Sequence, residues 1–391
     1  MKKILFFTVA AATVMALTGC SQSSDLAETA ETSQTAISFD TYLAKTRAGV
    51  SGSQTTETLK TNGFGVFAYY TAQDYSENAT PNFMYNTLVK GNTTGTATGW
   101  IYAPLRYWPA NGKVSFFAYA PYVEVKNDDG TPLTDATSGI TRIVDNSQAT
   151  LPYVNYNLGK DITNCVDLLR GVKKSTDSEM NTNLTNSTDM VGFTFKHALA
   201  KLNIKAKTVS SIDAATKITI QSIKISNTNF NQLGTLLLND GTWKNTGGTV
   251  ADFTLDQKQI NTNFAESLIH EIQNSNDLTT FQNIAGLTST AQSVMIGDKS
   301  CYLIPTSKPT MTIEVTYWVR TLDKNLRYGV TSEGSSNTIT KTITFTNDFQ
   351  SNKQYSLTLN IGLKAITFDA EVSNWDAEVT ANPDAVDISV K

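Results

Sequence analysis

Cysteine and histidine are the residue types in this chain with the broadest chemistry, and the 391 residues include only three cysteines and two histidines. Cys20 follows an apolar leader, in which Lys2 and Lys3 precede an almost unbroken hydrophobic run from Ile4 to Leu17. That layout is typical of an export signal, and the run is shorter than the roughly 18 apolar residues that a membrane-spanning helix needs. The sequence therefore predicts an export signal directly before Cys20.

The residues around this thiol, Leu17-Thr18-Gly19-Cys20, resemble the bacterial lipobox, in which the cysteine is acylated and becomes the first residue of the mature chain. The resemblance implies a lipoprotein signal peptide over residues 1–19 and lipidation of Cys20. Each buried methylene of an acyl chain contributes about 0.8 kcal/mol, so several chains hold a protein on a membrane for long periods. An ordinary signal peptide with an incidental cysteine is the alternative.

The remaining cysteines and histidines do not form a catalytic or metal-binding pattern. Cys165 and Cys301 are too far apart for a CxxC motif, and we expect buried free thiols; a single long-range disulfide is the alternative. His197 lies on one face of a predicted strand, where we expect a structural residue whose ring nitrogen bonds a neighbouring loop. The sequence has no nucleophile elbow, P-loop, zincin or dinucleotide-binding motif. We therefore expect no enzyme, no metal site and no cofactor, although the two carboxylates of a glycosidase would leave no sequence signature.

Composition favours an all-β fold. Charged residues make up 17% of the chain, below the typical quarter, and threonine and asparagine are abundant. β-Branched residues are enriched in strands. The formal net charge is −4 without any block of Lys and Arg, so we expect no binding to nucleic acid. Without its leader the chain is still longer than one hydrophobic core usually serves, which favours two domains.

Alternation of apolar and polar residues predicts the strands that would position a functional site. Ile37 to Leu43 alternates and stands between two polar stretches, Ser21 to Thr35 and Val50 to Asn62, both of which we expect to be pliable. Val114 to Ala120 is apolar on both faces, as a packed central strand would be. In the second half, period-2 strands with threonine-rich outer faces indicate antiparallel sandwiches. We expect Thr176 to Asp189 to be a loop and place a domain boundary between residues 188 and 189.

Several blocks in the first half of the chain match the motifs of one family. Val191 to Lys207 reads VGFTFKHALAKLNIKAK, similar to an F-x-H-A-L-[AS]-K-L signature. Trp100 to Tyr122 is similar to a W-x-Y-x-P-x-x-Y-W-P block followed by an F-F-A-Y-x-P strand, and DLL at Asp167 to Leu169 also fits. Together with the lipobox, these motifs resemble the fimbrillin-like proteins, the type V pilins of Bacteroidales. The resemblance implies two tandem transthyretin-like antiparallel β-sandwich domains, over residues 48–188 and 189–391.

The resemblance also implies an assembly route. Pilins of this family are exported as lipoproteins, cleaved after an arginine by a trypsin-like protease, and polymerised by strand exchange. The matching cleavage site lies between Arg47 and Ala48, so residues 20–47 would form a lipidated propeptide. Cleavage would remove the lipid together with the first predicted strand. The apolar face of that removable strand carries Ile37, Phe39 and Leu43.

The far end of the sequence supplies a candidate donor strand. Val386, Ile388 and Val390 alternate with polar residues, and the loss of a strand exposes backbone groups that pair with another strand. We expect the donor region in Phe368 to Trp375 and Asp384 to Lys391; the alternative is a final strand of the chain's own domain. A donor that fills a neighbour's groove makes an open, heterologous contact, which gives a filament. The expected partners are therefore other pilin subunits, and we expect a stalk subunit.

The sequence thus predicts a structural subunit of a cell-surface fimbria that serves adhesion. It would be an outer-membrane lipoprotein precursor first and part of an extracellular fimbrium afterwards. The alternative is a surface glycan-binding lipoprotein that stays monomeric, because β-sandwiches with exposed aromatic residues bind glycans. The aromatic cluster in question is Trp100, Tyr102, Tyr107 and Trp108. We favour core packing for it, because two prolines hold it in a strand-turn context.

Overall fold

The computed structural model describes residues 35–43, 55–92, 99–124, 139–144, 150–159, 165–174, 176, 179–186, 189–209, 212–213, 215–265, 286–321, 335–363, 366–375 and 386–387. All of them belong to one compact unit, Thr35–Lys391. Among the predicted lipidation, cleavage and donor-strand residues, Cys20, Arg47, Ala48, Ile388 and Val390 lie outside the described residues.

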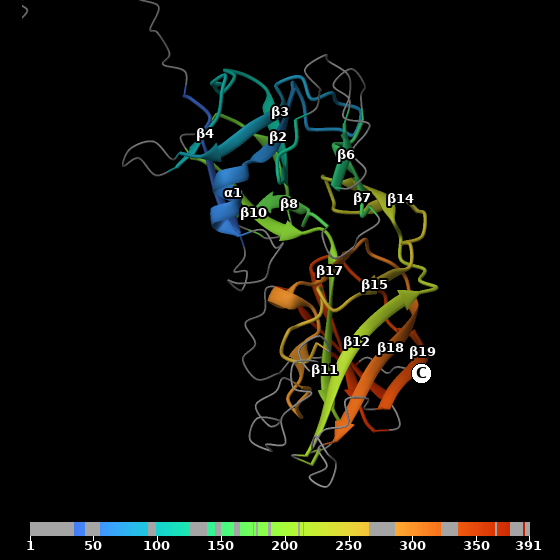
Figure 1. Ribbon diagram of the computed structural model, residues 1–391. Coiled ribbons are helices and arrows are strands. Elements are labelled where there is room, and N and C mark those ends of the chain that lie inside the picture. The colour runs from blue at the N-terminus through green and yellow to red at the C-terminus, as the bar shows by residue number, and fades with distance from the viewer. Residues whose placement is uncertain are drawn as a thin grey trace, which may run out of the picture. The chain divides into compact units, whose positions relative to one another are not determined.

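The described part of the chain is almost entirely β-structure, which confirms the predicted fold class (Figure 1). Its largest sheet has the order β1 (Phe39–Leu43), β10 (Val191–His197), β8 (Leu169–Lys173), β5 (Lys113–Ala120), β2 (Phe64–Thr71), β3 (Met84–Gly91) and β4 (Trp100–Ile101), with β9 (Asn181–Leu184) also paired to β5. A second sheet has the order β14 (Trp243–Gly247), β13 (Leu233–Leu237), β7 (Tyr153–Asn157) and β6 (Gly139–Ile143).

Two further sheets are built from the second half of the chain. One has the order β15 (Phe253–Leu255), β12 (Thr216–Ser226), β18 (Thr310–Thr321) and β19 (Ser335–Thr344), and Figure 1 shows the last three side by side. The other has the order β16 (Gln292–Ser293), β11 (Ala200–Thr208), β20 (Lys353–Ile361), β21 (Ile366–Asn374) and β22 (Val386–Asp387), with β17 (Cys301–Leu303) also paired to β11. The strand pairs are antiparallel except β1 with β10 and β11 with β20.

β5 separates two hydrophobic cores, as its apolar pattern on both faces predicts. Phe116 points into a cluster that also holds Phe39, Phe64 and Phe193, which we call the first core. The next residue, Phe117, belongs to a larger cluster that extends through the other sheets. Successive side chains of a strand point to opposite faces, so one strand contributes to both cores.

The predicted threonine-rich outer face lies on β18 and β19. Most inward side chains of β18 and Ile343 of β19 are buried, whereas outward threonines form pairs across the two strands. The hydroxyls of Thr312 and Thr342 lie 3.2 Å apart, and those of Thr316 and Thr338 lie at the same distance. Such cross-strand pairs stabilise a sheet on its solvent side.

The sequence prediction is wrong for two short elements. Part of the stretch expected to be pliable forms the helix α1 (Thr56–Asn62), because Thr55 and Thr58 make a capping box and Leu59 is buried in the first core. Part of the expected loop forms β9, where the Asn183 amide donates to the Ser115 hydroxyl at 2.9 Å. Polar hydrogen bonds, which leave no apolar period, hold both elements. Neither α1 nor any other described helix has the length and apolar character needed to span a membrane.

Strand pairing continues across the expected domain boundary between residues 188 and 189. β10 follows that position yet pairs with β8, and β13 pairs with β7. The chain passes from the first sheet to the sheet of β11 between His197 and Ala200. The division into two tandem transthyretin-like domains therefore stays a prediction. Cys165 and Cys301 are buried thiols, as expected.

Candidate strand-insertion site

The N-terminal strand lies between two segments that are far from each other in the sequence. On one side β1 pairs in parallel with β10, from Phe39 opposite Val191 to Leu43 opposite Phe195. On the other side the Ile37 amide donates to the Arg106 carbonyl and the Trp108 amide donates to the Thr35 carbonyl, both at 2.9 Å. We call residues 35–43 the inserted segment, because their backbone bonds join two separate edges.

The inserted segment contributes its apolar face to the first core. Ile37, Phe39 and Leu43 are between 1% and 4% exposed. Burying a side chain of this size contributes roughly 1.5–3 kcal/mol. The ring of Phe39 lies 5.3 Å from that of Tyr102 and 6.0 to 6.4 Å from those of Phe64, Phe116 and Phe193. The three residues predicted for the removable strand thus lie together on one buried face.

Tyr102, which follows β4, contacts the inserted segment through hydrogen bonds. Its phenol donates to the Ile37 carbonyl at 2.9 Å and accepts a hydrogen bond from the Arg106 amide at 3.2 Å. Burial raises the pKa of Tyr102, so the phenol remains protonated and able to donate this bond.

Most of the aromatic cluster noted in the sequence faces the first core. The Trp100 ring meets Phe64 edge-on at 5.2 Å, and the buried Trp108 ring meets Phe116 at 5.8 Å. Tyr107 alone of the four is largely exposed, at 44%. The cluster therefore packs mainly as core, as favoured from the sequence, and does not present the row of open rings that a glycan-binding face would need.

The outward face of β1 carries a charge pair. Asp40 accepts a hydrogen bond from the ammonium of Lys174, which follows β8. Beside this pair lies a cavity of about 790 Å³, whose walls include Asp40, Trp108, Lys173, Lys174, Met190 and Val191. The hydroxyl of Thr41 is buried and has no hydrogen-bond partner among the described residues. Nothing in the sequence pattern identifies Lys174, because its role depends on tertiary placement.

The C-terminal candidates are placed differently from one another. β21 pairs along its whole length with β20, from Ile366 opposite Ile361 to Asn374 opposite Lys353, so Phe368 to Trp375 lies within the chain's own sheet. This placement agrees with the alternative hypothesis for that segment. β22 pairs with the edge of β21 through Val386 and Asp387.

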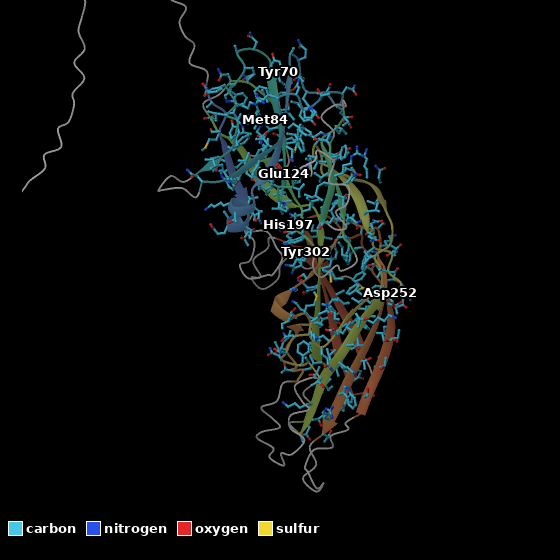
Figure 2. The ribbon with its side chains drawn as sticks, turned by 45° about the horizontal axis from the view of Figure 1, so that its top comes forward. Tyr70, Met84, Glu124, His197, Asp252 and Tyr302 are labelled. Atoms are coloured by element: carbon cyan, nitrogen blue, oxygen red, sulfur yellow. The ribbon has the colours of Figure 1, made fainter. Side chains whose placement is uncertain are left out.

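His197 links the end of β10 to the end of β21. Its Nδ1 lies 2.9 Å from Asp167 Oδ2, in the segment before β8, and both side chains are buried. Its ring stacks on Trp375 with centroids 3.8 Å apart, and Trp375 stacks on Tyr302 at 5.4 Å. Figure 2 labels His197 and Tyr302. The predicted contact of His197 is confirmed, because a ring nitrogen bonds a neighbouring segment.

The arrangement defines a class of protein: an all-β scaffold whose N-terminal strand completes a hydrophobic core. Within the ranges that the structure describes, no cluster of three or more His, Cys, Asp or Glu residues could hold a metal ion. What the site offers is backbone pairing and apolar surface for a strand.

The chain belongs to the fimbrillin-like family, whose sequence model matches residues 46–375. A relative, the fimbrium subunit Fim1C of Phocaeicola vulgatus, is 34% identical over 254 residues. That alignment covers 62% of this chain and 62% of Fim1C. The crystal structure of a fimbrial protein from Bacteroides vulgatus has the same fold, with a TM-score of 0.64 and 23% identity, covering 87% of this chain and 99% of that one.

Proposed function

We propose that this protein is a structural subunit of a cell-surface fimbria, which polymerises by strand exchange and serves adhesion. The observation that carries the proposal is the inserted segment. It completes the first core and ends only a few residues before Arg47, so one cut would separate it covalently from the rest of the chain. The membership of the family and the name of the relative Fim1C support the same function.

Maturation would proceed from membrane to filament. Acylation of Cys20 holds the precursor at the outer membrane, and a trypsin-like protease cuts between Arg47 and Ala48. The family match begins at residue 46, next to the proposed cut, and leaves the inserted segment outside it. The mature subunit then enters an extracellular fimbrium together with other pilin subunits.

After the cut, the inserted segment would be held by noncovalent contacts alone. Its three buried apolar side chains contribute roughly 1.5–3 kcal/mol each, and its backbone hydrogen bonds contribute about 1 kcal/mol net each. Association entropy opposes this sum once the covalent link is gone, so release of the segment becomes possible and another strand can take its place. Its departure would expose backbone groups of β10 and of residues 106–108, which favour pairing with a new strand.

We expect Arg47→Ala to give a folded, lipidated monomer that does not polymerise, because the inserted segment stays covalently attached. The measurement is a gel-filtration profile of the protein after limited trypsin treatment. Arg142→Ala, which replaces an exposed arginine on β6, is the matched control and should form oligomers like the wild type. Oligomer ladders from Arg47→Ala would contradict the assigned cleavage site.

Deletion of residues 384–391 should block polymer growth and spare the fold. The described part of this tail pairs with the edge of β21 only at Val386 and Asp387, so its removal costs the monomer little. Thermal unfolding followed by circular dichroism checks the fold, and electron microscopy of the trypsin-treated protein checks for filaments. Filaments from the tailless protein would rule out this tail as the donor.

A further inference from the structure

We infer that the tail of one subunit enters the groove of the next in a single register, with Asp387 taking the position of Asp40. The inference rests on the proposed function. Phe39–Leu43 reads FDTYL and residues 386–390 read VDISV. Both stretches carry an apolar residue, an aspartate, a β-branched residue, a polar residue and an apolar residue, in that order.

The side chain of Lys174 is positioned to bind an aspartate at the place of Asp40. Asp40 lies opposite Gly192 of β10, and the Lys174 amide donates to the Gly192 carbonyl at 3.1 Å. A Cβ on Gly192 would lie 2.9 Å from the Cβ of Lys174, so the missing side chain lets Lys174 reach across β10 to Asp40. Departure of the inserted segment takes this carboxylate away from Lys174.

A tail in the same orientation restores the pair. With Val386 at the position of Phe39, Asp387 falls beside Lys174 and Val390 takes the position of Leu43. The side chains of Lys174 and Asp40 are 46% and 33% exposed, so an ion pair here adds little affinity. Charge complementarity of this kind fixes the register of two partners instead.

Thr41 provides a second, independent indication. Strand alternation puts Thr41 on the side of Phe39 and Leu43, and its buried hydroxyl has no partner among the described residues. A buried polar group without a hydrogen bond is unfavourable, and Ile388 would place an apolar side chain there. Val386 is smaller than Phe39 and would fill less of its site, so the tail would not fit the groove more tightly than the inserted segment does. The exchange is therefore driven forward by the irreversible cut.

In the main competing register the tail is shifted by two residues, toward the position of Ile37. It would place Val386 at the position of Ile37 and Ser389 beside Lys174, so no carboxylate side chain would face the ammonium, and it would leave the site of Leu43 empty. In the register that we infer, Asp384 falls at the position of the buried Ile37. Burying a carboxylate there is unfavourable, so pairing begins at Val386.

Cysteine cross-linking tests the register. Tyr42 lies opposite Thr194 of β10, and neighbouring strands bring paired Cα atoms within disulfide range. Full chains carrying Thr194→Cys with Ser389→Cys should give covalent ladders on a non-reducing gel after limited trypsin treatment. Thr194→Cys paired with Asp387→Cys or with Lys391→Cys should give at least about ten-fold less cross-linked product, because a disulfide tolerates little displacement. The uncut chain is the control, since its groove is occupied.

Each outcome is decisive. Ladders from the Asp387→Cys or Lys391→Cys chain, with none from Ser389→Cys, would show another register or direction and overturn the inference while the proposed function stands. Filaments without any cross-link would also overturn it. Wild-type protein that is cut yet never polymerises would refute the proposed function itself.

Swapping the charges of Lys174 and Asp387 gives a second test, which does not require a substitution at the buried Thr194. Lys174→Glu in the cut protein should slow filament growth several-fold, because it places two like charges beside each other in the inferred register and lowers the association rate. Adding Asp387→Lys to the same chain should restore the wild-type rate. Equal slowing in both variants would contradict the pairing of these residues.

Discussion

Replacing Phe39 by alanine should lower the free energy of unfolding of the uncut chain by about 3–5 kcal/mol, the usual cost of removing a buried aromatic ring. Phe39 is 2% exposed, and its ring touches aromatic rings from β2, β5 and β10 and from the segment after β4. These neighbours are held by three separate strands, so they cannot close on the void. Urea denaturation followed by tryptophan fluorescence measures the loss.

The same substitution should affect the stability of the uncut precursor but not that of the filament. If the inserted segment leaves on maturation, filaments of Phe39→Ala should match wild-type filaments in stability, because neither contains residue 39. Ser38→Ala changes an exposed side chain of the same segment and should shift the unfolding free energy by less than about 0.5 kcal/mol. A Phe39→Ala precursor as stable as the wild type would mean that the first core does not depend on this strand.

Trp375→Ala should lower the free energy of unfolding by about 3–5 kcal/mol in the uncut chain and in the polymer alike. Trp375 is 6% exposed, stacks on both His197 and Tyr302, and lies 5.6 Å from the Lys201 ammonium. All of these contacts lie within one chain, so strand exchange should not change them. Chemical denaturation of the monomer and of depolymerised filaments tests this expectation.

Thr367→Ala, an exposed position of the same strand, is the control and should leave stability unchanged. The experiment also decides between the two donor regions considered from the sequence. If Trp375→Ala leaves the monomer stable and stops polymerisation, then Phe368 to Trp375 is the donor, and the pairing of β21 with β20 is given up on assembly.

The regular strands were predictable because their signal is local. Alternation identified the strands now seen as β18, β19 and β20, and the apolar run Val114 to Ala120 identified a strand buried on both faces. α1 and β9 were not predicted, because a capping box and side-chain hydrogen bonds stabilise them and such bonds leave no apolar period in the sequence. Partners were not predictable either: β1 pairs with β10, and a single sequence carries no trace of a contact at that separation.

The candidate site was predictable only in part. Its apolar residues, Ile37 and Phe39 among them, follow from strand period, and the structure brings them onto one buried face. Lys174 and Tyr102 contribute through an ion pair and a hydrogen bond to the inserted segment. Their partners are set by how β8 and the segment after β4 are placed around β1, which local periodicity does not encode.

The stack of His197 on Trp375 has a mechanical consequence. His197 ends β10, the strand that flanks the inserted segment, and Trp375 directly follows β21, the strand that precedes the tail in the sequence. In a filament of the proposed kind, tension would enter each subunit along β10 and leave it beyond Trp375. In the register that we infer, the donor strand lies parallel to β10, as β1 does in the uncut chain, so a pull loads its hydrogen bonds in shear, all at once, instead of breaking them one after another. The stacked rings of His197 and Trp375 would then join these two points of each subunit by direct contact.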